Sequence, residues 1–540
     1  MAVDEAPDGF RGTFRNDLLA RSLYAEGAGI ARSVPRAVAV PADIDDASTL
    51  IRWAKREGHG LIPRGSGSGM AAGAVGPSVV VDVSRFKDMD AVDSSARSIR
   101  VGAGALRGDI DAAARRVGVR YPVDPSSGNF CTIGGMAGTN AAGARTLRYG
   151  ATRPWVMGVR CVFDDGSVSW IRRGEAPPVA VPAVARLVAT LEALQRHGAG
   201  GAFKHAGVRK ESSGYAVTGS DGNALVDLLV GSEGTLALFT EFELRLIPVA
   251  GATATVLATF PSLEAATACA TDARDAGASA CELLDRTFLD VAASAGPTGI
   301  PADAEAVLLC EVEGESPGEA AALVERLAAR CRGFGATSAV TAVDAEAEHR
   351  LWTLRHAASP ILARLAPRLR SMQFIEDGCV PPDRFPEYVR GVRGALGRAD
   401  TTGVIFGHAG DSHAHVNPLV DVTRAGWRER VRGLLDEVCD LTARCGGTLA
   451  GEHGDGRLRA PLMARVWTDE ARAAFANIKA AADPAGLFNP GCKIARDGDD
   501  GLANLRYDPE AAPLDPRARA ALDSIERDRA WHRFRMDYAG

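Results

Sequence analysis

The sequence predicts an α+β protein with two large parts, of which the second is a ferredoxin-like α+β domain. The chain has 540 residues, which is too long for one hydrophobic core and indicates several domains. Before residue 250, short strands alternate with glycine-rich segments. After it, strands and helices follow the order β-α-β-β-α-β, which is typical of ferredoxin-like folds.

Composition and charge are those of a globular protein. Hydrophobic residues make up 46% of the chain, and its formal charge of −6 offers no basic face to nucleic acid. The acidic start lacks the regions of a signal peptide, and no apolar run reaches the ~18 residues of a spanning helix. The ten cysteines include no CxxC pair, which argues against an iron–sulfur site. We expect a cytoplasmic protein, or one peripheral to the inner face of the membrane, with no nucleic-acid partner and no transmembrane segment.

The first glycine-rich segment follows a predicted helix at 43–57 and a short strand. It reads PRGSGSGMAAGAVG over 63–76, and its glycines let backbone N–H groups converge on an anion such as a pyrophosphate. A Rossmann turn is excluded, because the strand at 78–83 leaves no room for the required helix. The turn VGAGALRG has Arg107 in place of the third glycine, so NAD binding is rejected there too.

The next segment, residues 121–150, consists of small residues without an apolar period. A loop of this length is uncommon unless it is functional, and it would let backbone approach a large flat ligand. Strands at 156–163 and 167–171 predict a hairpin. Residues 228–248 predict a strand, a glycine-flanked turn at 232–234 and a second strand.

In the second part, four strand-like runs are separated by helices at 263–276 and 318–332. The stretch LWTLRHAAS places Arg355 and Ser359 one helical turn apart on one face. From the residues alone, Arg355 would be an ordinary surface arginine.

The strongest chemical signal lies in two glycine-bearing turns, GHAGDSHAHVNP and GEHGDG. The first holds three of the ten histidines, and the second presents a glutamate beside another histidine. These residues are His408, His413, His415, Glu452 and His453. Imidazole and carboxylate ligands suit Zn²⁺ or a similar divalent ion and leave a coordination position for substrate. A metal-dependent hydrolase on another fold is one reading of these residues.

These segments resemble a known flavoprotein superfamily. PRGSGSGMAAG, DPSSGNFCTIGGMAGTNAAG and GSEGTLALFTE are similar to the FAD-binding signatures of the vanillyl-alcohol oxidase/p-cresol methylhydroxylase (PCMH-type) superfamily. GHAGDSHAHVNP, GEHGDG and FNPGCKI are similar to its branch of D-lactate, D-2-hydroxyglutarate and glycolate dehydrogenases. The resemblance implies a two-subdomain PCMH-type FAD-binding domain at 1–250, a substrate or cap domain with the metal site at 251–460, a segment returning to the flavin at 461–495, and a charged tail at 496–540.

The resemblance also implies which residues contact FAD. They are Pro63, Arg64, Gly65, Ser66, Gly67, Ser68, Gly69, Met70, Pro125, Ser126, Ser127, Thr132, Gly134, Gly135, Thr139, Asn140, Glu233, Gly234 and Asn489. Relatives with covalent flavin carry a histidine in the first glycine loop. None lies at 66–70, so we expect non-covalent FAD.

For the chemistry, the resemblance assigns a divalent metal, Zn²⁺ or alternatively Mn²⁺, to His408, His415 and Glu452. It implies that His453 is the base that takes the substrate proton, and that His413 is either a supporting partner of the ligands or a third imidazole ligand. It implies that the substrate is bound by Arg355, Ser359 and Asn417. Arg355 is expected to act in catalysis by fixing the orientation of the substrate carboxylate.

The implied activity is metal-assisted oxidation of a D-2-hydroxy acid to the 2-oxo acid, with hydride passing to flavin N5. The acid is D-lactate-like or D-2-hydroxyglutarate-like, and Ile375 in place of the lysine of hydroxyglutarate dehydrogenases favours a monocarboxylic tail. A quinone, an electron-transfer flavoprotein or a separate iron–sulfur protein is the expected acceptor, and a homodimer is one expected assembly. The alternative is a flavin-binding electron-transfer subunit of a larger complex.

Overall fold

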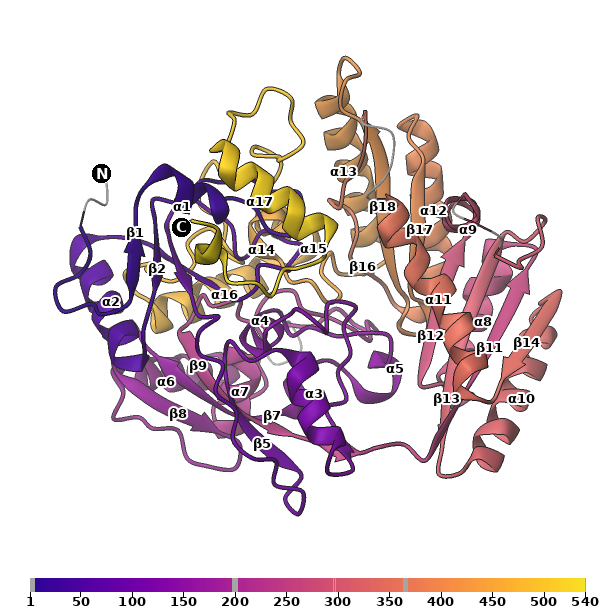
Figure 1. Ribbon diagram of the computed structural model, residues 1–540, viewed down its shortest axis with the longest axis horizontal. Helices are drawn as coiled ribbons and strands as arrows, with labels where there is room; N and C mark the ends of the chain where they lie inside the picture. The colour runs from indigo at the N-terminus through magenta and orange to yellow at the C-terminus, as the bar shows by residue number, and fades with distance from the viewer. Residues whose placement is uncertain (1–4, 197–202, 295, 297, 363–367, 540) are drawn as a thin grey trace.

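The structure is a computed structural model that describes residues 5–539 apart from 197–202, 295, 297 and 363–367, and it leaves out the side chains of 356–362. Two lobes lie side by side (Figure 1). The first holds the elements up to β10 together with the C-terminal elements, and the second holds β11 to α13. No helix in the described part of the chain is long and apolar enough to span a bilayer.

A four-stranded sheet in the order β1-β2-β4-β3 carries the first glycine-rich segment. β2, β4 and β3 are parallel, and β2 and β4 are buried throughout, because AVAV and VVVD are the continuous hydrophobic runs that central parallel strands need. The predicted helix is confirmed as α2, which starts at the capping Asp43 and ends at Gly58 in the left-handed conformation. The bounds are β1 Thr13–Arg15, α1 Leu18–Leu23, β2 Ala37–Val40, α2 Ile44–Glu57, β3 Leu61–Arg64 and β4 Val79–Asp82.

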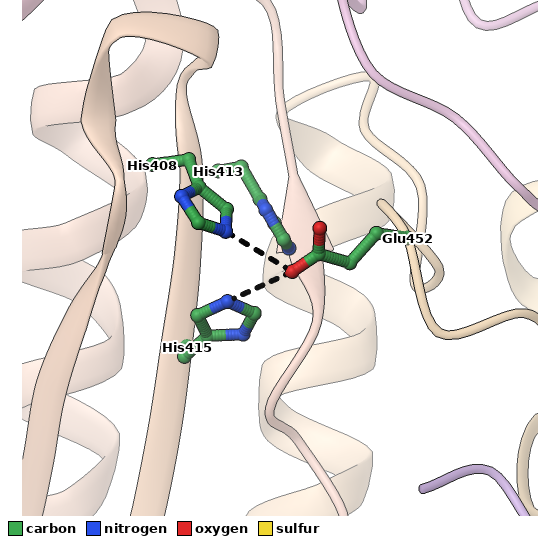
Figure 2. A group of neighbouring side chains, drawn as sticks. All are labelled: His408, His413, His415 and Glu452. Atoms are coloured by element: carbon green, nitrogen blue, oxygen red, sulfur yellow. Dashed lines mark hydrogen bonds and ion pairs between the residues drawn. The ribbon is translucent and has the colours of Figure 1, made fainter. Parts of the chain in front are cut away.

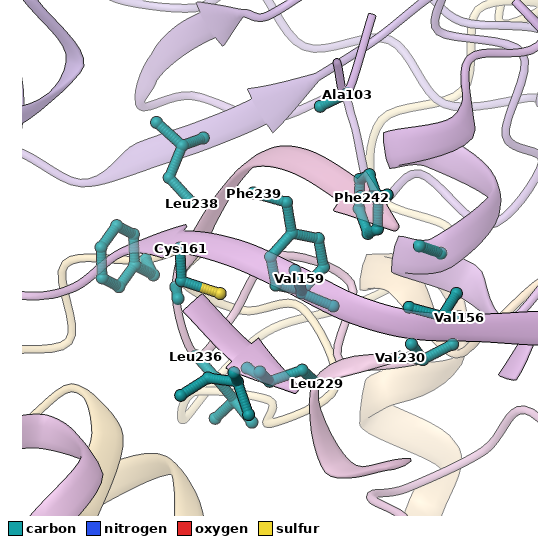
Figure 3. Close-up of a cluster of buried hydrophobic side chains, with 14 of the residues drawn as sticks. Ala103, Val156, Val159, Cys161, Leu229, Val230, Leu236, Leu238, Phe239 and Phe242 are labelled. Carbon is teal, nitrogen blue, oxygen red and sulfur yellow. The ribbon is translucent and has the colours of Figure 1, made fainter. Parts of the chain in front are cut away.

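An antiparallel sheet in the order β5-β9-β7-β8 forms the rest of this lobe. The predicted hairpin is confirmed by the pairing of β7 with β8. Phe242 of β9 and Val159 of β7 belong to its hydrophobic core (Figure 3). The strands are β5 Ser98–Gly102, β7 Val156–Val162, β8 Val168–Arg172 and β9 Leu238–Arg245, beside the short pair β6 Val119–Arg120 and β10 Ile247–Pro248.

Two predictions for this lobe are wrong. Residues 121–150 are not one loop, because Thr132 accepts a hydrogen bond from the backbone N–H of Gly135 and starts a helix of small residues. The run LLV was predicted as a strand but lies at the end of a helix. The prediction failed because a short buried apolar run is compatible with both a helix and a strand. The helices of this lobe are α3 Arg107–Arg115, α4 Ile133–Thr139, α5 Thr146–Tyr149, α6 Pro182–Arg196 and α7 Gly222–Leu229.

The second lobe is built on an eight-stranded sheet. Its strands β14-β11-β13-β12 have the ferredoxin-like order, which confirms the predicted topology. β17 then pairs with β12 and extends the sheet through β18 and β15, with β16 also paired to β18. The strands are β11 Ala252–Phe260, β12 Ala280–Asp285, β13 Ala306–Gly314, β14 Ser338–Ala342, β15 Leu369–Ser371, β16 Gly378–Cys379, β17 Gly403–His408 and β18 His413–Asp421.

The β17–β18 hairpin turns at Ala409–Asp411 and ends beside the first lobe, so its histidines reach the junction. The helices here are α8 Leu263–Ala273, α9 Arg286–Ala293, α10 Pro317–Gly333, α11 Ala345–Leu362, α12 Phe385–Arg398 and α13 Trp427–Arg444. The chain then returns to the first lobe through α14 Gly456–Arg459, α15 Met463–Val466, α16 Asp469–Ala482 and α17 Pro516–Arg527.

Candidate active site

A cavity of about 1220 Å³ lies between the lobes. One wall is made by the glycine loop after β3, by residues 124–145 and by the turn at Glu233. The opposite wall is made by β17, β18 and the turn that carries Glu452 and His453. The space exceeds that of a typical drug-sized pocket, so it has room for a dinucleotide and a small acid together.

All but two of the predicted FAD contacts line this cavity. The exceptions are Asn140 and Asn489, which have structural partners. Asn140 caps the end of α4, and its side-chain oxygen accepts from the backbone N–H of Arg153. The amide of Asn489 donates to the carbonyl of Glu233 at 2.7 Å. Both residues therefore hold wall segments in place through hydrogen bonds without lining the cavity themselves.

Arg64 holds the glycine loop in place. Its guanidinium is buried and donates to the backbone carbonyls of Tyr24 and Ala74, 3.1 and 3.2 Å away, and to that of Glu26 at 2.8 Å. The loop also packs tightly on the start of α4, since a Cβ at Gly65 would lie 2.1 Å from the Thr132 hydroxyl. Glycine at position 65 is therefore required by the close packing of the loop on α4, which holds the loop backbone at the cavity wall.

Glu233 joins three of the motifs in space. Its carboxylate accepts from the backbone N–H groups of Asp455 and Gly456 at 2.8 and 2.9 Å, and it pairs with the buried ammonium of Lys493 at 3.1 Å. GSEG, GEHGDG and FNPGCK are therefore held together by one buried ionic cluster. Glu233 lines the cavity, but its charge is already compensated by the protein.

The histidine–glutamate cluster has the donor arrangement of a metal site. One carboxylate oxygen of Glu452, Oε1, lies 3.1 Å from Nε2 of both His408 and His415 (Figure 2). The other ring nitrogens already have acceptors: Nδ1 of His408 donates to Glu282 at 2.5 Å, and Nδ1 of His415 donates to the carbonyl of Glu376 at 2.9 Å.

This arrangement decides which atoms are free for a metal. With Nδ1 donating, Nε2 of a neutral imidazole presents a lone pair. Two such lone pairs facing one carboxylate oxygen repel it unless the rings are protonated or a cation lies among them. Hydrogen bonds from the opposite ring nitrogen are how proteins orient metal-binding histidines. His408, His415 and Glu452 therefore fit a divalent cation.

His413 supports the cluster from behind. It is fully buried, and its Nε2 donates to Asp377 Oδ1 at 2.8 Å. The same carboxylate accepts from the backbone N–H groups of Glu452 and His453, so it fixes the GEHG turn. Burial lowers the pKa of His413 to about 3, which keeps the ring neutral. A Cβ at Gly451 would lie 2.7 Å from this ring, which explains the glycine.

His453 reaches the cavity from the same turn. Its Nδ1 donates to Glu376 Oε2 at 2.7 Å, and its Nε2 lies 3.8 Å from Glu452 Oε1. Burial opposes the charged ring, but Glu376 and Asp377 outweigh it and raise the pKa of His453 to about 9. Arg459 pairs with Glu376, so this buried carboxylate stays ionised. The ring is thus anchored at one nitrogen while the other faces the cluster.

Among the predicted substrate residues, Arg355 and Asn417 line the cavity near the cluster. The Arg355 guanidinium donates to Glu282 at 2.6 Å and lies over the Phe406 ring, 5.0 Å from its centroid. The side chain of Ser359 lies outside the described residues.

Ile375 does not face the cavity. It packs in the hydrophobic core with Met372 and Phe374. The residues of this segment that line the cavity are Leu369, Arg370, Ser371, Gln373 and Glu376. A lysine missing at this position therefore does not by itself favour a monocarboxylate. The sequence argument for such a preference is corrected, because it assumed that this side chain faces the substrate, whereas it packs in the hydrophobic core.

Comparisons with known proteins agree with this geometry. An FAD binding domain matches residues 35–172, and the C-terminal domain of FAD linked oxidases matches residues 250–492. The glycolate oxidase subunit GlcD of Bacillus subtilis (strain 168) is 30% identical over 472 residues, which cover 86% of this chain and 90% of that relative. The chain belongs to the PCMH-type family of FAD-linked oxidases. Its FAD-binding domain indicates FAD as the cofactor.

Another relative and a solved structure match the chain at lower identity. The D-lactate dehydrogenase of Archaeoglobus fulgidus is 27% identical over 465 residues, covering 85% of this chain and 91% of that protein. A solved structure of 4-ethylphenol oxidase from Gulosibacter chungangensis superimposes with a TM-score of 0.65 at 15% identity, over 89% of this chain and 94% of the other. That likeness concerns the fold alone. The family excludes a hydrolase on an unrelated fold.

Several buried residues at this site were missed by the sequence reasoning. Glu282 orients both His408 and Arg355, and Lys210 lies 2.6 Å from Glu452 Oε2. A charge inside the apolar strand ACELLD was a usable signal for Glu282, because an unpaired carboxylate is rarely buried. For Lys210, in VRKESS, no such signal exists, since only the fold brings it to Glu452.

We predict that this protein holds its FAD non-covalently. The glycine loop has no histidine, and Cys131, a cysteine on the cavity wall, stays a thiol because burial raises its pKa to about 11. Acid precipitation should leave the yellow colour in the supernatant. Flavin that remains in the washed pellet would contradict this.

Proposed function

We propose that the protein is an FAD-dependent, metal-assisted dehydrogenase that oxidises a D-2-hydroxy acid to the 2-oxo acid. One observation carries this proposal: a single cavity has the FAD-binding loop on one wall and the His408–His415–Glu452 cluster with His453 on the other. An oriented base, a cation site and a flavin site on one cavity are what removal of hydrogen from a C–OH group requires.

The cluster would hold a divalent cation, Zn²⁺ or Mn²⁺, through Nε2 of His408, Nε2 of His415 and the carboxylate of Glu452. Burial opposes ionisation of Glu452, but Lys210 and His408 lower its pKa well below the usual range, so the carboxylate is an anionic ligand. When bound, such an ion polarises the substrate hydroxyl and lowers its pKa.

His453 would take the hydroxyl proton. The hydrogen bond from Nδ1 to Glu376 sets the direction of Nε2, which is the atom that accepts. The raised pKa of His453 belongs to a ring surrounded by carboxylates, and positive charge at the adjacent cluster would oppose its protonation. Glu376 then stabilises the imidazolium that forms.

Arg355 would bind the substrate carboxylate, and Asn417, two residues after His415 on the same face of β18, would bind a second polar group. Each proton and electron pair that leaves the substrate has an acceptor. The hydroxyl proton goes to His453, C2 loses its hydrogen with the bonding electrons, and the C–O bond becomes a carbonyl. FAD bound on the opposite wall would supply the acceptor of that hydride, flavin N5.

The test is a panel of acids mixed anaerobically with the FAD- and metal-loaded protein while flavin absorbance is followed. We expect a D-2-hydroxy acid, D-lactate or D-2-hydroxyglutarate, to bleach the flavin and its L-enantiomer to leave it oxidised. Added NAD⁺ should yield no NADH. Glycolate belongs in the panel because a relative is named for it.

Failure of the whole panel would contradict the proposal. If dithionite still bleaches the flavin and metal is bound, that result would favour a flavin-binding electron-transfer subunit. This is the second candidate because the relative GlcD is named as a subunit of a glycolate oxidase. Its acceptor would be a quinone, an electron-transfer flavoprotein or an iron–sulfur protein.

A further inference from the structure

The C-terminal segment, residues 501–539, forms part of the cavity wall, although the family match to the FAD linked oxidases ends at residue 492. Figure 1 shows its helix α17, in yellow, beside α1. The wall residues from this segment include Arg506, Tyr507, Arg519, Glu526, Arg529 and Trp531. A segment that the sequence shows only as charged and without a ligand cluster therefore encloses the predicted cofactor site.

The segment is attached to the first lobe by hydrophobic and ionic contacts. Ala518 and Ala521 of α17 pack with residues of α1 in one buried cluster. Nη1 of Arg519 donates to both carboxylate oxygens of Glu26, each 2.9 Å away. Glu26 is 1% exposed, lies on the cavity wall and also pairs with Arg32 at 2.7 Å. Arg519 and Arg32 together neutralise a carboxylate that would otherwise repel an anionic ligand.

The same segment is attached to the second lobe. Asp508 pairs with Arg428 of α13, and the nearby Asp500 pairs with Arg432 at 2.5 Å. The guanidinium of Arg370 lies over the Tyr507 ring, 5.8 Å from its centroid. The segment thus bridges the two lobes across the cavity.

Residues 24–28 connect this segment to the glycine loop. The backbone N–H of Ala28 donates to the carbonyl of Gly67 at 3.0 Å, and the carbonyl of Glu26 accepts from Arg64 at 2.8 Å. Arg519 holds the side chain of the same Glu26. Arg519, together with Arg32, therefore holds the stretch that supports the loop.

Arg535, in the same C-terminal segment, is a buried guanidinium whose charge acts on Arg64. It is 3% exposed, and none of its three guanidinium nitrogens has a hydrogen-bond partner among the described residues. Burial lowers its pKa to about 10, and repulsion from Arg64 acts in the same direction. The nearby anion is Asp82, which accepts from the Tyr24 hydroxyl. Two guanidinium groups thus face one carboxylate.

A buried cation without hydrogen bonds costs stability unless something else compensates it. Asp82 and the Trp531 ring, whose centroid lies 5.2 Å from the Arg535 guanidinium, offset part of this charge. An anion bound at the glycine loop that Arg64 supports would offset more of it. We propose that residues 501–539 are part of the FAD-binding site, closing the cavity and, through Arg519 and Arg535, supporting the loop and its positive charge for the FAD pyrophosphate. This inference concerns cofactor retention and does not depend on the substrate.

The test measures FAD affinity in full-length variants. Apoprotein is titrated with FAD while flavin fluorescence is followed, and thermal unfolding is recorded with and without FAD. For Arg535→Met we expect roughly tenfold weaker FAD binding, the size of one charge-assisted interaction, while the apoprotein unfolds at the same or a higher temperature. A residue that only stabilises the fold would not show these opposite effects.

Arg519→Gln is the second variant, and we expect it too to weaken FAD binding roughly tenfold. Arg517→Gln is the matched control, since Arg517 lies on the same helix with a side chain that is 73% exposed, and it should bind FAD like the parent. The proposal is overturned if Arg535→Met and Arg519→Gln both retain the parent's FAD affinity. It is also overturned if the control weakens binding as much as they do.

Discussion

Replacement of His453 by asparagine is expected to slow substrate-dependent flavin reduction by roughly 10²–10⁴-fold, the usual loss on removing a general base. That loss corresponds to about 3–5 kcal/mol of transition-state stabilisation. Asparagine keeps a donor for Glu376 but cannot accept the hydroxyl proton as a base. FAD, metal and substrate binding should persist, because the proposed metal ligands remain. Anaerobic stopped-flow of flavin bleaching measures the rate, and metal analysis checks the loading.

His349→Asn is the control, since His349 is exposed on α11. It should reduce flavin at the parent rate. If His453→Asn also reduced flavin at the parent rate, the base would lie elsewhere on the cavity wall. His413 could not replace it directly, because that ring is fully buried and bonded to Asp377.

Replacement of Glu452 by glutamine is expected to weaken metal binding at least about 100-fold, more than loss of a supporting partner typically does. A neutral amide is a weaker ligand for a divalent ion. The change also leaves the buried ammonium of Lys210 without the carboxylate that lies 2.6 Å away, so the remaining charge repels a cation. Titration with Zn²⁺ or Mn²⁺, followed by measurement of the bound metal, tests this.

Adding excess metal distinguishes the proposed metal ligand, Glu452, from the proposed base, His453. Excess Zn²⁺ or Mn²⁺ should partly restore flavin reduction in Glu452→Gln and leave His453→Asn slow. Glu346→Gln, at a side chain that is 85% exposed, is the matched control and should retain metal. A Glu452→Gln protein that binds metal as tightly as the parent would exclude the proposed ligand set.

Local signals were sufficient for much of the fold. The helix at 43–57 is set by its apolar spacing and its caps, and the hairpin at β7 and β8 by alternation and a DDG turn. The ferredoxin-like order follows from the run of strands and helices alone. These features depend on neighbours in the sequence, which is why periodicity predicts them.

Other elements depended on packing that no local pattern describes. α4 is made of small residues that pack closely on the glycine loop, so it has no hydrophobic period. The LLV run ends α7, which starts at the capping Asp221 and packs beside β8 and β7. Its short apolar run carries no period that separates helix from strand.

The sequence by itself determined which chemical groups are available at the site: the histidines and glutamate of two glycine-bearing turns, and the glycine loop. It also showed that these motifs together resemble one flavoprotein superfamily. Only the tertiary structure decided which nitrogen of each ring is free, because Glu282 and the carbonyl of Glu376 come from distant strands and segments. It also decided that Ile375 faces the core and that the charged C-terminal segment closes the cavity. The physical reason is that hydrogen bonds and ion pairs between distant segments depend on how the sheets bring them together, and residue spacing does not contain that information.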